Sequence, residues 1–378
     1  MKHYLSLLFA LLPLLVSCRE EVRAYDDLLT PLYTPEYASG FELYGLDGYS
    51  GTIIRSKNPW QGATDEVRDV FVQRGDEEPP RGFEGCVVPA DPQRVVVLSS
   101  SYIGMLDRLG LADRVVGVSG LSYVTNPYIS DPAHGVRDIG TVPDYELLLS
   151  LKPDVVLLYG LESANTVVTD KLDELGIPYI YFGEYLEEHP LGKCEWIVVV
   201  GELMDRRAAA VAYQEEVCRR YQAVKDLASR ADHRPSVMLN LPYNDVWQLP
   251  PMASFQTTLL TDAGSSPFYG REERGVMLRI GMETALEYLQ EADYWLHLGM
   301  VTRYEELPAN LREHASNIKS IREDHLYNNN RISNAAGGNA YFETGPVEPD
   351  VILSDLVSIF HPGLVEHKPV YYRQIAVK

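Results

Sequence analysis

Short apolar runs alternate with amphipathic segments from Arg94 towards the C-terminus. "RVVVLSSS" is followed by "YIGMLDRLG", and "DVVLLYG" by "NTVVTDKLDELG", in which apolar residues recur at helical spacing. Continuous apolar strands joined by helices are typical of a mainly parallel sheet covered on both faces. A second series of the same kind follows Arg234, with "PSVMLNL", "METALEYLQ", "DYWLHLG" and "DVILSDLVSIF". The pattern therefore predicts an α/β fold of two lobes, at 93–204 and 232–378, the second with a C-terminal tail.

One long segment without proline, residues 205–231, lies between the two series. Val211, Cys218, Tyr221 and Ala228 fall near helical spacing along it. Asp205 is the first residue of the segment and is a good N-cap candidate. The segment predicts a single interlobe helix that acts as a stiff spacer.

The chain before Arg94 has a different pattern. Residues 37–92 alternate apolar with polar positions and are punctuated by Gly and Asn-Pro, which predicts a β-rich N-terminal extension of short strands and hairpins. Residues 18–36 are acidic and turn-rich, and we expect a tether there.

The first 17 residues have a basic start and an apolar core that is short for a membrane span, and they predict a signal peptide. The end of this run, "LVSC", resembles a bacterial lipobox, which implies cleavage before Cys18 and acylation of Cys18. The lipid bilayer is then a partner through that cysteine. An ordinary signal peptide that happens to contain a cysteine is the alternative.

The charge of the chain excludes one class of partner. It has 33 Lys and Arg against 54 Asp and Glu, a net charge of −21, and such a surface repels the phosphates of nucleic acids. Apart from Cys18, the cysteines are Cys86, Cys194 and Cys218, an odd number that allows one disulfide or none. Their spacing shows no C-x-x-C motif, so we expect no zinc or iron–sulfur site.

Signatures of catalysis are missing from the sequence. There is no G-x-S-x-G motif, and the nine histidines form no H-x-x-x-H pair. A directly bound metal usually needs clustered His and carboxylate ligands. We therefore expect no enzyme activity, no cofactor and no directly bound metal.

A binding cleft does not need the motifs of catalysis or metal binding. Ligands of open α/β sheets lie beyond the carboxyl ends of the strands, so polar and aromatic residues that follow the predicted strands are the candidates. The chain has 25 tyrosines against nine phenylalanines, and tyrosine suits large conjugated or oxygen-rich ligands. The ligand-binding candidates at the strand ends and in the loops near them are Ser100, Tyr102, Tyr123, Tyr159, Glu162, Tyr243, Trp247, His297, Arg303 and Tyr341.

The order of several motifs resembles a known family. "VVVLSSSYIGMLDRLGLADRVVGVSG", "DIGTVPDYELLLSLKPDVVLLYG", "HPLGKCEWI" and "METALEYLQEADYWLHLG" occur in this order, and the series ends in "VEPDVILSDLVSIFHPGL". From Arg94 to Pro362 the chain resembles the periplasmic solute-binding proteins of ABC importers for iron complexes (siderophores, haem) and cobalamin. The resemblance implies two α/β lobes joined by one rigid helix, with the ligand between them, and we expect a monomer.

The same resemblance implies a role for two glutamates. The family docks on its permease through one exposed acidic residue on each lobe, and the matching motifs place Glu146 and Glu283 there. A carboxylate early in a helix is also favoured by the helix dipole alone, which is the alternative reading.

These observations predict a lipid-anchored solute-binding protein that captures a ferric siderophore or haem and delivers it to an ABC importer. A cobalamin or corrinoid ligand is the first alternative. A surface lipoprotein that scavenges its ligand without a permease is the second, and an enzyme such as a metal chelatase is the third. We expect an exported protein anchored to a bacterial membrane on its periplasmic face, with the cell surface as the alternative.

Overall fold

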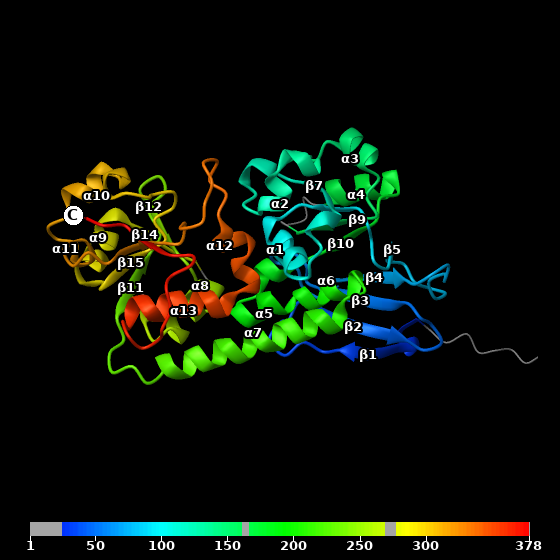
Figure 1. Ribbon diagram of the computed structural model, residues 1–378, viewed down its shortest axis with the longest axis horizontal. Coiled ribbons are helices and arrows are strands. Elements are labelled where there is room, and N and C mark those ends of the chain that lie inside the picture. Colours follow the sequence, from blue (N-terminus) through cyan, green and yellow to red (C-terminus); the bar gives the residue numbers. More distant parts are fainter. Residues whose placement is uncertain (1–24, 161–165, 269–276, 378) are drawn as a thin grey trace, which may run out of the picture.

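Two α/β lobes lie side by side in the computed structural model, which describes residues 25–160, 166–268 and 277–377 (Figure 1). This arrangement confirms the predicted fold class. Cys18, the predicted lipidation site, and Glu162, a predicted ligand-binding residue, lie outside the described residues.

The N-terminal lobe is built on a five-stranded parallel sheet in the order β10-β9-β6-β7-β8. The apolar runs form its central strands, and β9 is buried along its whole length. The strands are β6 (Val95–Val97), β7 (Val115–Val118), β8 (Arg137–Asp138), β9 (Val155–Leu158) and β10 (Tyr179–Tyr181). The helices are α1 (Ser100–Arg108), α2 (Pro127–Ser130), α3 (Tyr145–Leu151) and α4 (Thr166–Leu175).

The C-terminal lobe repeats this design with the strand order β13-β11-β15-β16-β17, parallel except for the last pair. Its strands are β11 (Ser236–Leu239), β13 (Ser266–Pro267), β15 (Tyr294–Leu296), β16 (Leu326–Asn328) and β17 (Arg373–Gln374). A separate two-stranded antiparallel sheet pairs β12 (Val246–Leu249) with β14 (Leu278–Gly281). Its helices are α8 (Phe255–Asp262), α9 (Met282–Glu291), α10 (Ala309–Glu313), α11 (Lys319–Arg322), α12 (Ala340–Glu343) and α13 (Pro349–Phe360).

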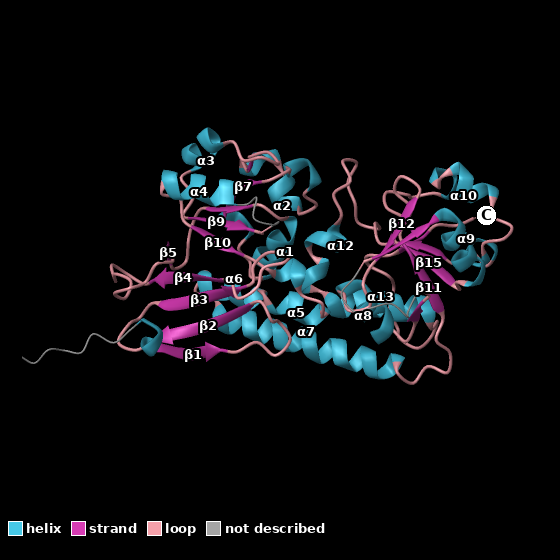
Figure 2. Cartoon of the chain, turned by 180° about the vertical axis from the view of Figure 1, so that it is seen from behind, coloured by secondary structure: helices cyan, strands magenta, loops and turns pink. Residues whose placement is uncertain are grey.

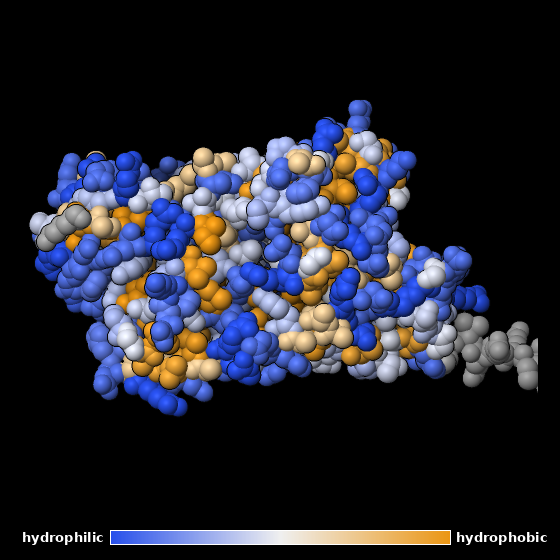
Figure 3. Space-filling view, in the orientation of Figure 1, coloured by the Kyte–Doolittle hydropathy of each residue, from blue (hydrophilic) through white to orange (hydrophobic). Residues whose placement is uncertain are grey.

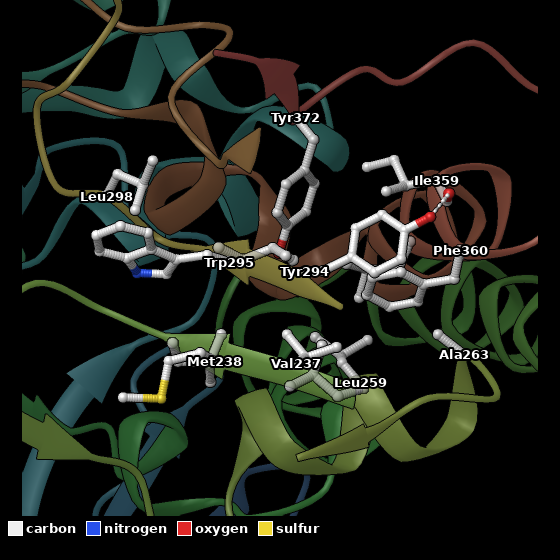
Figure 4. Close-up of a cluster of buried hydrophobic side chains, with 14 of the residues drawn as sticks. Val237, Met238, Leu259, Ala263, Tyr294, Trp295, Leu298, Ile359, Phe360 and Tyr372 are labelled. Atoms are coloured by element: carbon white, nitrogen blue, oxygen red, sulfur yellow. Dashed lines mark hydrogen bonds between the residues drawn. The ribbon is translucent and has the colours of Figure 1, made fainter. Parts of the chain in front are cut away.

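Aromatic side chains fill the core of this lobe around β11 and β15 (Figure 4). Tyr294 donates its hydroxyl hydrogen to the Ile359 carbonyl at 3.2 Å, and its ring meets Phe360 edge-on at 5.0 Å. Trp247 and Trp295 pack with ring centroids 5.6 Å apart. These contacts join the five-stranded sheet to α13 and to the two-stranded β12–β14 sheet.

The interlobe helix is α7 (Arg207–Ala228), preceded by the short helices α5 (Pro190–Glu195) and α6 (Ile197–Leu203). Asp205 was wrong as the N-cap, because the cap residue is Arg206 and the Asp205 carboxylate pairs with Arg74 at 2.7 Å. The helix packs on α6 near its start and on α13 further along, where Arg220 and Asp350 form an ion pair at 2.6 Å. It therefore runs under both lobes (Figure 1).

The N-terminal extension forms a five-stranded sheet in sequence order, antiparallel except for its last pair. Its strands are β1 (Leu29–Tyr33), β2 (Phe41–Leu46), β3 (Thr52–Lys57), β4 (Val67–Gln73) and β5 (Cys86–Pro89). The first strand lies within the predicted tether, so the tether prediction was wrong for residues 29–33. The buried face of this sheet joins the core of the N-terminal lobe, where Phe41 packs on Trp196 at 5.0 Å.

Three buried carboxylates tie the extension to α5, α6 and the turn before α5. Glu195 accepts hydrogen bonds from the Tyr33 hydroxyl and from the backbone N–H groups of residues 36, 37 and 38, at 2.7–2.8 Å. Glu187 accepts bonds from the Ser39 and Gly40 N–H groups, and Glu202 accepts one from the Thr52 hydroxyl. Buried carboxylates need such donors, so docking of the extension and burial of these charges are coupled.

The two lobes also touch directly through α12, which lies between them in both views (Figures 1 and 2). The Glu343 carboxylate accepts bonds from the N–H and the hydroxyl of Thr125, both at 2.8 Å, and Asn334 donates to the Ser122 carbonyl at 2.9 Å. At Gly104 of α1, an added Cβ would lie 2.2 Å from the Glu343 carbonyl oxygen, so only glycine permits this approach. We call these contacts the interlobe contact.

Candidate functional site

A cleft of about 650 Å³ opens between the two lobes. Ligand pockets typically occupy about 300–1,000 Å³, so the cleft is large enough for a bulky small molecule. It lies where the carboxyl ends of β6 and β10 meet the first turn of α8 and the α12 segment. The lining residues are 61, 99–101, 184–188, 193, 251, 253–256, Tyr341, Phe342 and Pro346.

The N-terminal lobe contributes polar groups to this cleft. Helix α1 begins directly after β6, so residues 99–101 present hydroxyl groups and the start of the helix to the cleft. The Ser101 hydroxyl donates to one oxygen of Glu184 at 2.6 Å, and the other oxygen of Glu184 has no partner within the described residues. Burial raises the pKa of the Glu184 carboxyl, which favours its protonated form.

Lys193 of α5 lines the same part of the cleft. Its ammonium donates to the Glu184 backbone carbonyl at 2.8 Å and lies 5.5 Å from the centre of the Phe255 ring. Among the described residues it forms no ion pair with a carboxylate. Burial lowers the pKa of Lys193, because the charged form loses hydration there.

Glu187 also lines the cleft, but its carboxylate is fully engaged. It accepts bonds from the Ser39 and Gly40 N–H groups at 2.9–3.0 Å and from the Trp196 indole at 3.0 Å. These donors come from the N-terminal extension and from the residue before α6. The extension therefore holds this wall of the cleft in place.

Aromatic rings from the C-terminal lobe face these polar groups. Tyr341 meets Phe255 edge-on with ring centroids 6.4 Å apart, and Phe342 is 54% exposed. The Tyr341 hydroxyl is buried without a partner in the described part of the chain. The cleft thus offers an aromatic wall opposite a polar one, which suits a ligand with apolar faces and oxygen atoms.

The structure brings Ser100 and Tyr341, of the ten predicted ligand-binding residues, to the lining of this cleft. Tyr159 instead lines a smaller cavity of about 220 Å³ in the N-terminal lobe. The ring of His297 lies behind Tyr341, 5.6 Å from its centroid, and its Nε2 is 2.7 Å from the Tyr372 hydroxyl.

Two candidates were wrong as cleft residues, because both are fully buried in the protein core. Tyr102 packs on Phe182 with ring centroids 4.8 Å apart, and Trp247 donates its indole N–H to the Leu239 carbonyl at 2.7 Å. Both are 0% exposed. Helical and strand periodicity turn these side chains inward.

Three further candidates lie on the surface, away from the lining of the cleft. Tyr123 is 54% exposed and belongs to the loop of the interlobe contact. Tyr243 is 73% exposed beside the two-stranded β12–β14 sheet. Arg303 pairs with Glu306 at 2.9 Å in a capping arrangement. Their roles in ligand binding stay predictions, as does that of Glu162.

The sequence reasoning missed Glu184, Lys193 and Phe255. Glu184 follows β10, so the strand-end rule could have included it. Phe255 begins α8 after the N-cap Ser254, which is a recognisable helix start. No local pattern marks Lys193, since only the fold brings α5 to the cleft.

Glu146 and Glu283 are both exposed, one on each lobe. Glu146 lies in the first turn of α3, where Asp144 caps the helix by accepting a bond from the Leu147 N–H at 3.0 Å. Glu283 lies in the first turn of α9. Neither residue lines the cleft, and their docking role stays a prediction.

Other site types find no support in the described residues. No group of three or more His, Cys, Asp or Glu side chains is placed there to hold a metal ion. Cys86, Cys194 and Cys218 are free thiols, which answers the open question of their pairing. Among the described helices, none has both the length and the apolar composition of a bilayer crossing. In Figure 3, hydrophobic groups reach the surface in separate patches between hydrophilic ones.

Comparison with known proteins gives a consistent result. The model of a family described as "Periplasmic binding protein" matches residues 95–330. An uncharacterized lipoprotein of Methanocaldococcus jannaschii is 23% identical over 368 residues, covering 89% of this chain and 84% of the relative.

Two solved structures share the fold. One is from an ABC-type Fe3+-hydroxamate transport system of Saccharomonospora viridis, with a TM-score of 0.53 and 18% identity over 72% of this chain and 94% of that chain. The other is the periplasmic vitamin B12 binding protein of Vibrio cholerae, with a TM-score of 0.51 and 13% identity over 72% of this chain and 97% of that one. At these identities the likeness shows the fold alone.

Proposed function

The chain belongs to the periplasmic binding protein family, and from that premise we propose that it captures a bulky iron complex, a ferric siderophore or haem, and delivers it to an ABC importer. The observation that carries the proposal is the cleft of about 650 Å³ between two lobes, with an aromatic wall facing a polar one. Iron complexes of this kind present both apolar faces and oxygen atoms, and the two walls complement both features.

A protein that binds iron inside a finished complex contacts the organic ligand and needs no metal ligands of its own. A corrinoid such as cobalamin is the alternative cargo, because it too is large, flat and rich in amide oxygens. The structure of the vitamin B12 binding protein shares the fold and favours keeping this alternative.

Purification from the native host, followed by an absorption spectrum and mass spectrometry of the bound material, tests the proposal directly. Haem, ferric siderophores and corrinoids absorb at different wavelengths. A preparation that carries none of them, and that also fails to bind haemin, ferrioxamine B or cyanocobalamin in a titration, would overturn the proposal.

Delivery to a permease is proposed to depend on Glu146 and Glu283. Both carboxylates are exposed and lie outside the cleft, one on each lobe, so they suit contacts with arginines of two membrane subunits. Reversal of either charge to lysine is expected to leave ligand affinity nearly unchanged. Uptake into reconstituted vesicles is expected to fall, and to fall further in the double variant.

Lys171→Glu, a charge reversal on exposed helix α4, is the matched control and is expected to preserve uptake. Loss of binding together with uptake in the two glutamate variants would assign both residues to the fold. Survival of both properties would show that delivery does not depend on these two glutamates, and the proposed docking role would be wrong.

The location of the protein is also part of the proposal. We propose export and attachment to the membrane through acylated Cys18, with the folded lobes on the periplasmic face. The related lipoprotein from Methanocaldococcus jannaschii, which spans most of this chain, supports the anchor.

A further inference from the structure

Lys193 is the feature of the cleft that the general proposal leaves unexplained. A partly buried ammonium normally has a carboxylate partner, because a cation loses hydration when it is buried. Here the contacts of Lys193 are the Glu184 backbone carbonyl and the Phe255 ring. Both are neutral, so the charge of Lys193 is not compensated by an ion pair within the described residues.

The nearest carboxyl groups, Glu184 and Glu187, attract the Lys193 ammonium electrostatically, but neither forms an ion pair with it among the described residues. Glu187 directs its carboxylate to the N–H groups of Ser39 and Gly40 and to Trp196, which lie on the extension side. Glu184 is held by the Ser101 hydroxyl, and its burial favours the protonated, uncharged form. Lys193 therefore has no carboxylate in direct contact, and its ammonium can still donate to one carried by a ligand in the cleft.

A second group of donors lies beside the first. Helix α1 has nine residues and starts at the cleft, and its N-cap Ser99 makes no side-chain capping bond. The backbone N–H groups of Ser100 and Ser101 donate no hydrogen bond to other described residues. A helix start of this kind favours negative charge. Ser101 and Lys193 both contact Glu184, so the two sets of donors converge on one corner of the cleft.

We infer that Lys193 and the start of α1 form a subsite for one carboxylate group of the cargo. The inference rests on the proposed function and narrows it to metal complexes that carry a free carboxylate beside the chelating or macrocyclic part. The aromatic wall of Tyr341, Phe342 and Phe255 then contacts the rest of the complex. At physiological salt the Debye length is about 8 Å, so the repulsion between the net charge of −21 and such a ligand is largely screened beyond that distance.

Matched pairs of ligands test the inference. Ferrioxamine B acylated with succinate carries one carboxylate, whereas the acetylated form carries none, and both hold iron in the same way. Haemin with its dimethyl ester, and a monocarboxylic acid of cyanocobalamin with the parent, provide the same comparison in the other two cargo classes. Affinities are measured by fluorescence quenching or calorimetry at physiological salt.

In the class that binds, the carboxylate member is expected to bind about 10- to 100-fold more tightly, as a hydrogen bond to a charged group implies. Lys193→Met keeps the aliphatic stem and is expected to remove the difference. Lys193→Arg keeps the charge and is expected to retain most of it. Lys171→Met, a neutralisation on exposed helix α4, is the matched control and is expected to keep the full difference.

Thermal unfolding of each variant verifies that it is folded, and the Arg variant keeps the test informative if the Met variant is not. Equal affinity for the two members of the binding pair, or a preference that survives in Lys193→Met, would overturn the subsite alone. Failure of the native chain to bind any member of the three pairs would overturn the proposed function, and the subsite with it.

Discussion

Replacement of Glu195 by glutamine should strongly destabilise the protein. The Glu195 carboxylate is 0% exposed and accepts four hydrogen bonds, from the Tyr33 hydroxyl and from three successive backbone N–H groups of residues 36–38. Glutamine has the same volume but only one accepting oxygen. Its amide nitrogen would face two donors that already point inward, and those two donors would lose their partner.

The magnitude follows from these contacts. A buried donor left without a partner costs about 1–3 kcal/mol, so two of them cost roughly 2–6 kcal/mol. Domains are usually stable by about 5–15 kcal/mol, so the loss is a large share of the total. Because Glu195 and Lys193 both lie on α5, we expect the same change to loosen the cleft wall.

Glu77→Gln is the matched control. Glu77 also accepts bonds from backbone N–H groups, those of Ser50 and Gly51, and from the Ser50 hydroxyl, but it does so at the surface, where water can replace it. We expect its change in stability to stay within about 1 kcal/mol. The assay is urea unfolding followed by tryptophan fluorescence, with limited proteolysis of the N-terminal segment. If Glu195→Gln costs no more than Glu77→Gln, the carboxylate does not hold the extension and the reasoning fails.

Three further predictions follow from the structure and the sequence. Burial lowers the pKa of His297 from 6.5 to about 4, so protonation of this residue favours the unfolded state. The free energy of unfolding should therefore fall by roughly 3 kcal/mol as pH drops from 6.5 to 4. In urea titrations the free energy of unfolding of His297→Gln should depend less steeply on pH, and an unchanged pH dependence would contradict the role given to His297. Cys18→Ala should release the protein from membranes in fractionation, and persistent attachment without an acyl group on the native chain would refute the anchor. The lobes should close only slightly on ligand binding, because α7 and the Glu343–Thr125 contact hold them; solution scattering that shows a large contraction would refute this.

The sequence alone was sufficient for the architecture. Apolar runs such as "VVV" at β6 and "VVLL" at β9 predict buried parallel strands because each run lacks the alternation of a half-exposed strand. The long proline-free segment predicted the interlobe helix, which spans Arg207–Ala228 within the predicted 205–231. These features are local, and local periodicity is what a sequence displays directly.

Which face a residue presents, and which distant residue it meets, depended on the tertiary structure. Ser100 and Tyr102 are two positions apart after the same strand, yet one lines the cleft and the other is buried in the core, because α1 rotates them to different sides. The edge strand β1 lies in an acidic segment whose local pattern does not predict a strand. It forms because it pairs with β2 and because Tyr33 at its end donates to Glu195, far along the chain. Lys193 and Ser101 converge on Glu184 only when α5, α1 and the end of β10 pack together. Such contacts join residues up to 162 positions apart, and no local period encodes them.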